Sequence, residues 1–129
     1  MTPELTVLIL AALLQCVQMA LYSVAGNAQA GTRAALSPRD RKVELTGRAG
    51  RLQRAMNNHF EGLILFGIAA VVIAVTGQSS DVTATAAWIY LIARVLYVPA
   101  YLFGLVPWRS LVWGLGWGAT LVMLLAALV

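Results

Sequence analysis

Residues 50–75 read GRLQRAMNNHFEGLILFGIAAVVIAV, a stretch in which a polar stripe runs directly into an apolar helix. Four polar side chains recur at spacings of three, four and three, which places them on one helical face: Arg51, Arg54, Asn58 and Glu61. The apolar run that follows, Leu63 to Val75, is shorter than the about 20 residues that a transmembrane helix needs. A spanning helix must therefore include the stripe, and charged groups inside a membrane indicate a functional site.

The composition predicts a membrane protein rather than a soluble domain. Of the 129 residues, 60% are hydrophobic and 11% are charged, which is far more apolar than a soluble domain of this size. The apolar segments predict four transmembrane helices, over residues 4–25, 46–76, 82–105 and 109–128. We therefore expect an all-α integral membrane protein in which residues 1–129 form a single four-helix transmembrane domain.

Basic residues are concentrated in one part of the chain. Seven of the nine Lys and Arg residues lie between positions 33 and 54, whereas the turn at 78–81 has none. The positive-inside rule then places the first and third connections in the cytoplasm and both termini on the other side of the membrane, the inner membrane if the source is bacterial. A basic cluster can also bind nucleic acid. Beside a membrane, we favour membrane topology and attraction to lipid headgroups as the reasons for the basic cluster, and we expect no nucleic-acid partner.

A second polar stripe lies on the third apolar segment, with spacings of three and four: Arg94, Tyr97 and Tyr101. The short turn between the second and third helices makes them antiparallel neighbours, so the two stripes can face each other. With a rise of about 1.5 Å per residue, Glu61 lies about 22 Å and Arg94 about 18 Å from this turn. The register predicts that Glu61 pairs with Arg94 as a structural brace. It also predicts two further pairs of neighbours: Asn58 with Tyr97, and Arg54 with Tyr101.

The remaining polar residues would border a pocket that opens to the cytoplasm: Arg51, Arg54, Asn58, Tyr97 and Tyr101. Such a set suits a small, anionic, peptide-like ligand, because arginines present paired donors to carboxylates while amides and phenols both donate and accept. Arg109 follows the third connection and could extend a cation into the same opening, where it would stabilise a thiolate. Three alternatives to a ligand pocket stay open for these residues. The arginines could contact lipid headgroups, the polar residues could form a purely structural network, and the tyrosines could lie at the membrane interface.

The single cysteine and the single histidine give no support for a metal site. Cys16 lies in an apolar segment, where we expect a packed and inert thiol. His59 lies off the polar stripe, where we expect a packing or interface residue. No set of ligands has metal-binding spacing, so we expect no metal.

The three polar motifs together resemble the MAPEG family, the membrane-associated proteins in eicosanoid and glutathione metabolism. The motifs are Arg51-x-x-Arg54-x-x-x-Asn58-x-x-Glu61, Arg94-x-x-Tyr97-x-x-x-Tyr101 and Pro107-x-Arg109-Ser110. The resemblance covers essentially the whole chain. It implies a homotrimer of four-helix bundles, with glutathione as co-substrate bound between protomers near the cytoplasmic face.

The same resemblance assigns roles to individual residues. It implies that six residues bind glutathione: Arg51, Arg54, Asn58, Glu61, Tyr97 and Tyr101. Arg109 falls near the arginine that activates the glutathione thiol, and Ser110 falls on the serine beside it, so these two are the candidate catalytic residues. The chain departs from the family at Met56, where several members have His or Gln, at Trp113, which lies near a family tyrosine, and in a connection before Arg109 that is one residue shorter.

The function that the resemblance implies is a glutathione transferase or peroxidase that acts on lipophilic electrophiles dissolved in the bilayer. Binding of both reactants at the membrane would bring a water-soluble and a lipid-soluble molecule together. The alternatives are a non-catalytic lipid-binding or scaffold protein of the same fold, and a small membrane subunit whose polar stripe only joins helices.

Overall fold

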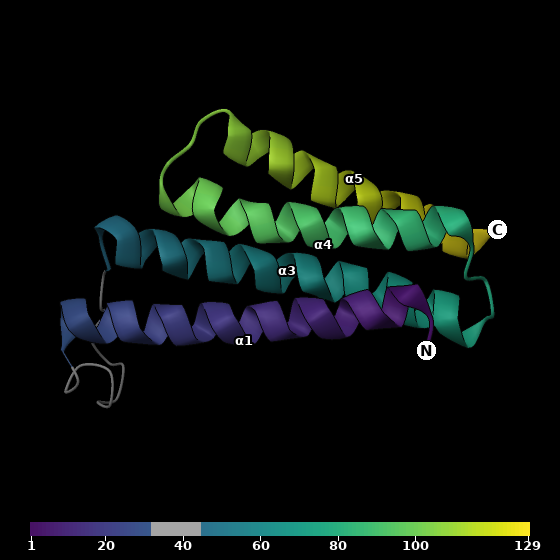
Figure 1. Cartoon of the computed structure of the whole chain (residues 1–129), viewed down its shortest axis with the longest axis horizontal. Helices are drawn as coiled ribbons and strands as arrows, with labels where there is room; N and C mark the ends of the chain where they lie inside the picture. The colour runs from purple at the N-terminus through teal and green to yellow at the C-terminus, as the bar shows by residue number, and fades with distance from the viewer. Residues whose placement is uncertain (32–44) are drawn as a thin grey trace.

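The computed structural model describes residues 1–31 and 45–129, and within these ranges the chain forms four helices (Figure 1). They are α1 (Pro3–Ala30), α3 (Gly47–Val75), α4 (Asp81–Leu102) and α5 (Trp108–Leu128). Each is long and apolar enough to cross a membrane. The predicted all-α class is confirmed, with four helices that are able to span a membrane, and the protein is an integral membrane protein. The basic residues predicted to lie in a cytoplasmic loop at positions 33–42 fall outside the described ranges.

The first helix is longer than the sequence predicts. α1 continues through Ala30 instead of ending near residue 25. In its last turn, the side-chain amide of Gln29 exchanges two hydrogen bonds with the backbone of Thr46, which precedes α3. The amide donates to the Thr46 carbonyl (2.8 Å) and accepts from its N–H (2.7 Å). These two bonds hold the end of α1 against the beginning of α3.

Helix α4, the third along the described chain, is shorter than predicted. α4 ends at Leu102 rather than near residue 105. Gly104 has a φ of 64°, a conformation that glycine adopts without steric cost. The N–H of Leu105 donates to the carbonyl of Ala100 over 2.9 Å. The helix therefore ends in a Schellman motif, in which a glycine follows the last helical turn and reverses the chain.

The helices form an antiparallel bundle in which α3 and α4 are central, α1 packs on α3 and α5 packs on α4 (Figure 1). Both termini and the α3–α4 turn lie at one end, here called the terminal end. The start of α3 and the α4–α5 connection lie at the other, here called the basic end. Many alanines on α3 and α4 are buried, including Ala69, Ala70, Ala86, Ala87 and Ala93, and such small residues let membrane helices approach closely.

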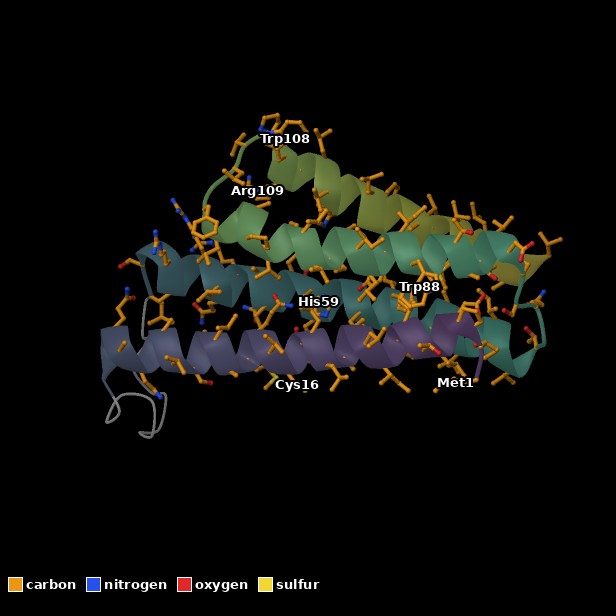
Figure 2. The ribbon with its side chains drawn as sticks, in the orientation of Figure 1. Met1, Cys16, His59, Trp88, Trp108 and Arg109 are labelled. Atoms are coloured by element: carbon orange, nitrogen blue, oxygen red, sulfur yellow. The ribbon has the colours of Figure 1, made fainter. Side chains whose placement is uncertain are left out.

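Large apolar side chains cover the outside of all four helices (Figure 2). This distribution suits contact with lipid, which is as apolar as the protein core. Cys16 lies on the exposed face of α1. The expectation of a packed thiol was therefore wrong, because Cys16 falls on the opposite side of α1 from the residues that contact α3.

A buried carboxylate joins α1 to the α3–α4 turn at the terminal end. Glu4 is fully buried in the first turn of α1. It accepts hydrogen bonds from the hydroxyl of Ser79, over 2.9 and 3.1 Å, and from the hydroxyl of Thr83. A buried charge is tolerated only when hydrogen bonds compensate for its lost hydration. These bonds fix the terminal end of the bundle, away from the predicted site.

Candidate functional site

Tyr101 contacts two arginines at the basic end of the bundle. Arg54 of α3 donates through Nε to the Tyr101 hydroxyl over 3.0 Å, and its guanidinium carbon lies 5.8 Å from the centroid of the ring. Arg109, at the beginning of α5, lies 5.0 Å from the same centroid. These are distances at which a guanidinium is attracted to an aromatic face. The predicted pairing of Arg54 with Tyr101 is confirmed, and three helices meet at this tyrosine.

A cavity of about 280 Å³ opens beside Tyr101, and we call it the arginine–tyrosine pocket. Its lining contains five of the predicted site residues and one further aromatic side chain: Asn58, Tyr97, Tyr101, Arg109, Ser110 and Trp113. The rings of Tyr97 and Tyr101 lie 5.6 Å apart. The structure thus brings the two candidate catalytic residues, Arg109 and Ser110, to the same cavity as the amide of Asn58.

Arg51 contacts the end of α4 instead of this pocket. Its Nη1 donates to the backbone carbonyl of Leu102 over 3.2 Å. The guanidinium lies beside Gly104, since a Cβ added there would be 3.6 Å from the guanidinium carbon of Arg51, an ordinary van der Waals contact. A cation at the C-terminus of a helix complements its unpaired carbonyls and its dipole. In the single chain, Arg51 therefore stabilises the connection that carries Arg109.

Arg94 does not take the partner that the register predicts. Its Nη1 donates to Oδ1 of Asn58 over 3.0 Å, and its Nε donates to Nδ1 of His59 over 3.2 Å. The guanidinium also lies 4.6 Å from the centroid of the Tyr97 ring. Glu61 is exposed, and the third guanidinium nitrogen of Arg94, Nη2, has no hydrogen-bond partner in the described part of the chain.

The predicted brace between Glu61 and Arg94 is therefore not formed within this chain. The physical reason is the face of α3 that meets α4. His59 is 1% exposed and contacts both Ala11 of α1 and Arg94 of α4, whereas Glu61 lies on an exposed side of α3 and carries a charge that would lose its hydration. Arg94 thus bonds to the neutral acceptors of Asn58 and His59. It still joins α3 to α4, but through different atoms.

His59 is the functional-site neighbour that sequence reasoning missed. It lies between α1 and α3 (Figure 2), where its Nε2 is 2.9 Å from the carbonyl oxygen of Ala11. A guanidinium can only donate, so Nδ1 accepts from Arg94 and the ring proton is on Nε2, which donates to Ala11. The expectation that His59 packs at an interface holds, and the ring also orients Arg94. The only sequence signal was its position directly after Asn58.

The described residues, 1–31 and 45–129, contain no group of three or more His, Cys, Asp or Glu side chains that could hold a metal ion. The site is therefore built from guanidinium, amide, phenol and hydroxyl groups. These groups bind anions and polar organic molecules.

A model of the MAPEG family matches residues 5–129 of the chain. The chain belongs to the MAPEG family. Many MAPEG members are glutathione-dependent enzymes. A comparison with curated proteins found no match for this MAPEG protein.

The pocket of this MAPEG protein has the groups that an anionic ligand requires. Arg54 and Arg109 both contact Tyr101, so two cationic groups border this tyrosine at the basic end. Asn58 is held by Arg94 through its side-chain oxygen, which leaves its amide nitrogen free of that bond and able to donate. The Ser110 hydroxyl stands at the first turn of α5 beside Arg109. A carboxylate or thiolate in this pocket would meet donors from three helices.

Proposed function

We propose that this protein binds glutathione in the arginine–tyrosine pocket and activates its thiol toward lipophilic electrophiles, as a transferase or a peroxidase. The observation that carries the proposal is the position of Arg109, which lines the same cavity as Asn58, Tyr97 and Ser110. A guanidinium beside a thiol favours the thiolate, which is the reactive nucleophile. The tyrosine and asparagine groups would hold the peptide part of the ligand.

The carboxylates of glutathione would be bound at the rim of the pocket. Arg54 is exposed and reaches the Tyr101 hydroxyl, so it can bind a carboxylate and the tyrosine together. Arg51 and Glu61 are exposed in the single chain. We propose that they contact glutathione across the interface of a homotrimer, in which the pocket of one protomer is closed by the next.

The orientation in the membrane follows from the same proposal. Arg48, Arg51, Arg54 and Arg109 all belong to the basic end of the bundle. Lys and Arg are retained on the cytoplasmic side of membranes. The basic end would therefore face the cytoplasm, where glutathione is supplied, while both termini would lie on the other side.

Calorimetric titration of the purified protein with glutathione tests the proposal. We expect binding at millimolar or lower concentration, with turnover of a reactive aryl halide or a lipid hydroperoxide by the bound thiol. Arg109→Ala should abolish turnover. Arg48→Ala is the matched control, because Arg48 lies over the ring of Phe103, at 5.6 Å from its centroid, and does not line the pocket. The absence of glutathione binding at millimolar concentration would refute the proposal.

A non-catalytic lipid-binding protein is the second candidate, and one feature favours it. A cavity of about 640 Å³ runs between α4 and α5 on the side of the bundle, and its lining is mostly apolar, including Ile89, Gly114, Gly118 and Val122. A cavity of this size and character suits an acyl chain. Glutathione binding without turnover of either substrate, together with co-purified lipid, would favour this candidate.

A further inference from the structure

A chain of three hydrogen bonds connects α1 to the arginine–tyrosine pocket through the interior of the bundle. His59 Nε2 donates to the carbonyl of Ala11 on α1 over 2.9 Å, and His59 Nδ1 accepts from Arg94 Nε over 3.2 Å. Arg94 Nη1 donates to Oδ1 of Asn58 over 3.0 Å, and Asn58 lines the pocket. His59 and Arg94 are both buried. The proposed ligand site is therefore joined to a helix that contributes none of its lining residues.

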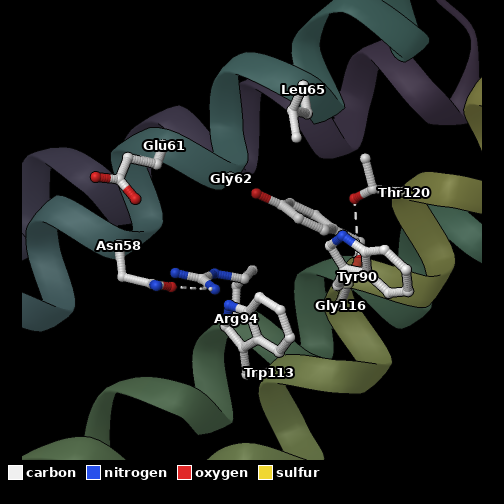
Figure 3. Close-up of a pocket in the computed structure, with 10 residues that line it drawn as sticks. Asn58, Glu61, Gly62, Leu65, Tyr90, Arg94, Trp113, Gly116 and Thr120 are labelled. Atoms are coloured by element: carbon white, nitrogen blue, oxygen red, sulfur yellow. Dashed lines mark hydrogen bonds between the residues drawn. The ribbon is translucent and has the colours of Figure 1, made fainter.

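Arg94 has a competing acceptor close to its own side chain. Arg94 and Glu61 line a cavity of about 270 Å³ that adjoins the arginine–tyrosine pocket at Asn58, and Figure 3 shows Glu61 on the same helix as Asn58. Glu61 is exposed, and Arg94 bonds to Asn58 and His59 instead of this carboxylate. Bonds from a guanidinium to a carboxylate are stronger than bonds to a neutral acceptor. The contact with Asn58 therefore depends on a further constraint on Arg94.

His59 supplies that constraint through its bond to Arg94 Nε. With Nε on His59 and Nη1 on Asn58, two nitrogens of the planar guanidinium are fixed, and the plane cannot turn toward Glu61 without breaking one of these bonds. The bond from Nε2 to Ala11 keeps the ring proton on Nε2 and leaves Nδ1 able to accept. The opposite tautomer would present a donor to the Nε donor of Arg94.

We propose that His59 is a positioning residue for the ligand site, because it holds Arg94 on Asn58 and away from Glu61. Two groups are set in this way. The oxygen of Asn58 stays on Arg94, and the NH₂ group stays available to donate to an acceptor on the ligand. Glu61 stays unpaired within the chain and available to the ammonium group of glutathione. The effect on glutathione rests on the proposed function, whereas the positioning of Arg94 and Asn58 does not.

Two substitutions separate the two bonds of His59. In His59→Asn, the side-chain oxygen takes the place of Nδ1 and accepts from Arg94, but the side chain is too short to reach Ala11. In His59→Gln, the amide takes the place of Nε2 and donates to Ala11, but the acceptor for Arg94 is lost. Each variant keeps a polar side chain and loses one bond, so the two are matched controls for each other. Glu61→Gln removes the charge of the competing acceptor at an exposed position.

The position of Asn58 is measured by NMR on the full-length, ligand-free protein in lipid nanodiscs, with ¹⁵N-labelled asparagine. A hydrogen bond to Oδ1 increases the double-bond character of the amide C–N bond. It therefore moves the side-chain nitrogen resonance downfield and slows rotation of the NH₂ group. The resonance is assigned by its loss in Asn58→Ser. Glutathione affinity is measured by calorimetry on the same samples.

We expect His59→Asn to keep the parent resonance and His59→Gln to shift it upfield, with faster rotation of the NH₂ group. Glu61→Gln added to His59→Gln should return the resonance toward its parent position, because the competing carboxylate is gone. Glu61→Gln alone should leave the resonance of the ligand-free protein unchanged. Glutathione should bind about three- to tenfold more weakly to His59→Gln than to His59→Asn, the effect of one hydrogen bond.

Three results would overturn the inference. They are a parent resonance in His59→Gln, an equal shift in the two His59 variants, and a resonance that stays shifted when Glu61→Gln is added to His59→Gln. A shift in Glu61→Gln alone would overturn it as well, and this variant leaves the buried side chains intact. If His59→Gln shifts the resonance while no form of the protein binds glutathione, the positioning role stands and only the proposed function is refuted.

Discussion

The bond between His59 and Arg94 predicts a measurable energetic coupling at the centre of the bundle. His59→Leu removes the acceptor of Arg94 Nε and the donor to Ala11, while it retains an apolar side chain in a site that is 1% exposed. Interhelical hydrogen bonds in membranes contribute about 0.6 kcal/mol on average and up to about 1.7 kcal/mol. Bonds to charged groups are stronger than neutral ones. Since two bonds are lost, we expect the free energy of unfolding to fall by about 1–3 kcal/mol.

A double-mutant cycle isolates the contact between the two side chains. The free energy of unfolding is measured for the parent protein, His59→Leu, Arg94→Met and the double variant, by titration of mixed micelles with a denaturing detergent. We expect a coupling energy of about 1–1.5 kcal/mol. Phe60→Leu is the control at a neighbouring, exposed position of the same helix. A coupling energy below about 0.5 kcal/mol would show that the two residues act independently and would refute the reasoning.

Three further predictions concern the ligand pocket and the two ends of the bundle. Tyr101→Phe removes the hydroxyl that accepts from Arg54, so glutathione affinity measured by calorimetry should fall about three- to tenfold, and an unchanged affinity would contradict this role. Glu4→Ala removes the acceptor at the terminal end and should lower the free energy of unfolding by about 1–3 kcal/mol, whereas a change below about 0.5 kcal/mol would mean that the carboxylate is not an anchor. Gly104→Ala should cost about 1–2 kcal/mol because its φ is 64°. Gly114→Ala, inside α5 where the added Cβ meets no atom of another helix within 4 Å, should be neutral or stabilising.

The sequence predicted the fold well because a bilayer leaves few choices. Twenty or so apolar residues in a row must form a helix in lipid, since every backbone group needs an internal partner. The position of the short turn then made α3 and α4 antiparallel neighbours. The helix ends were less predictable. α1 continues past residue 25 into small and polar residues that a hydropathy argument excludes, and α4 stops early because Gly104 reverses the chain.

The site was predicted in part, because spacing specifies a face of a helix but not the exact partner. The register correctly paired Arg54 with Tyr101, which share the basic end. It failed for Glu61, because the spacing of the polar residues cannot show that Arg94 bonds to Asn58 and His59 instead. The buried hydroxyl of Tyr90, which has no partner among the described residues, could not be predicted either, because its position depends on the stacking of the ring on Phe66.

The ultraviolet difference spectrum of glutathione bound to the purified protein at neutral pH tests most directly whether Arg109 activates a thiol in the arginine–tyrosine pocket. An ordinary cysteine thiol has a pKa of about 8.5 and is mostly protonated under these conditions. We predict a thiolate absorbance on binding that is retained in Arg48→Ala and lost in Arg109→Ala, because only Arg109 lines the pocket. Bound glutathione that shows no thiolate absorbance, or an absorbance that Arg109→Ala leaves unchanged, would contradict the account.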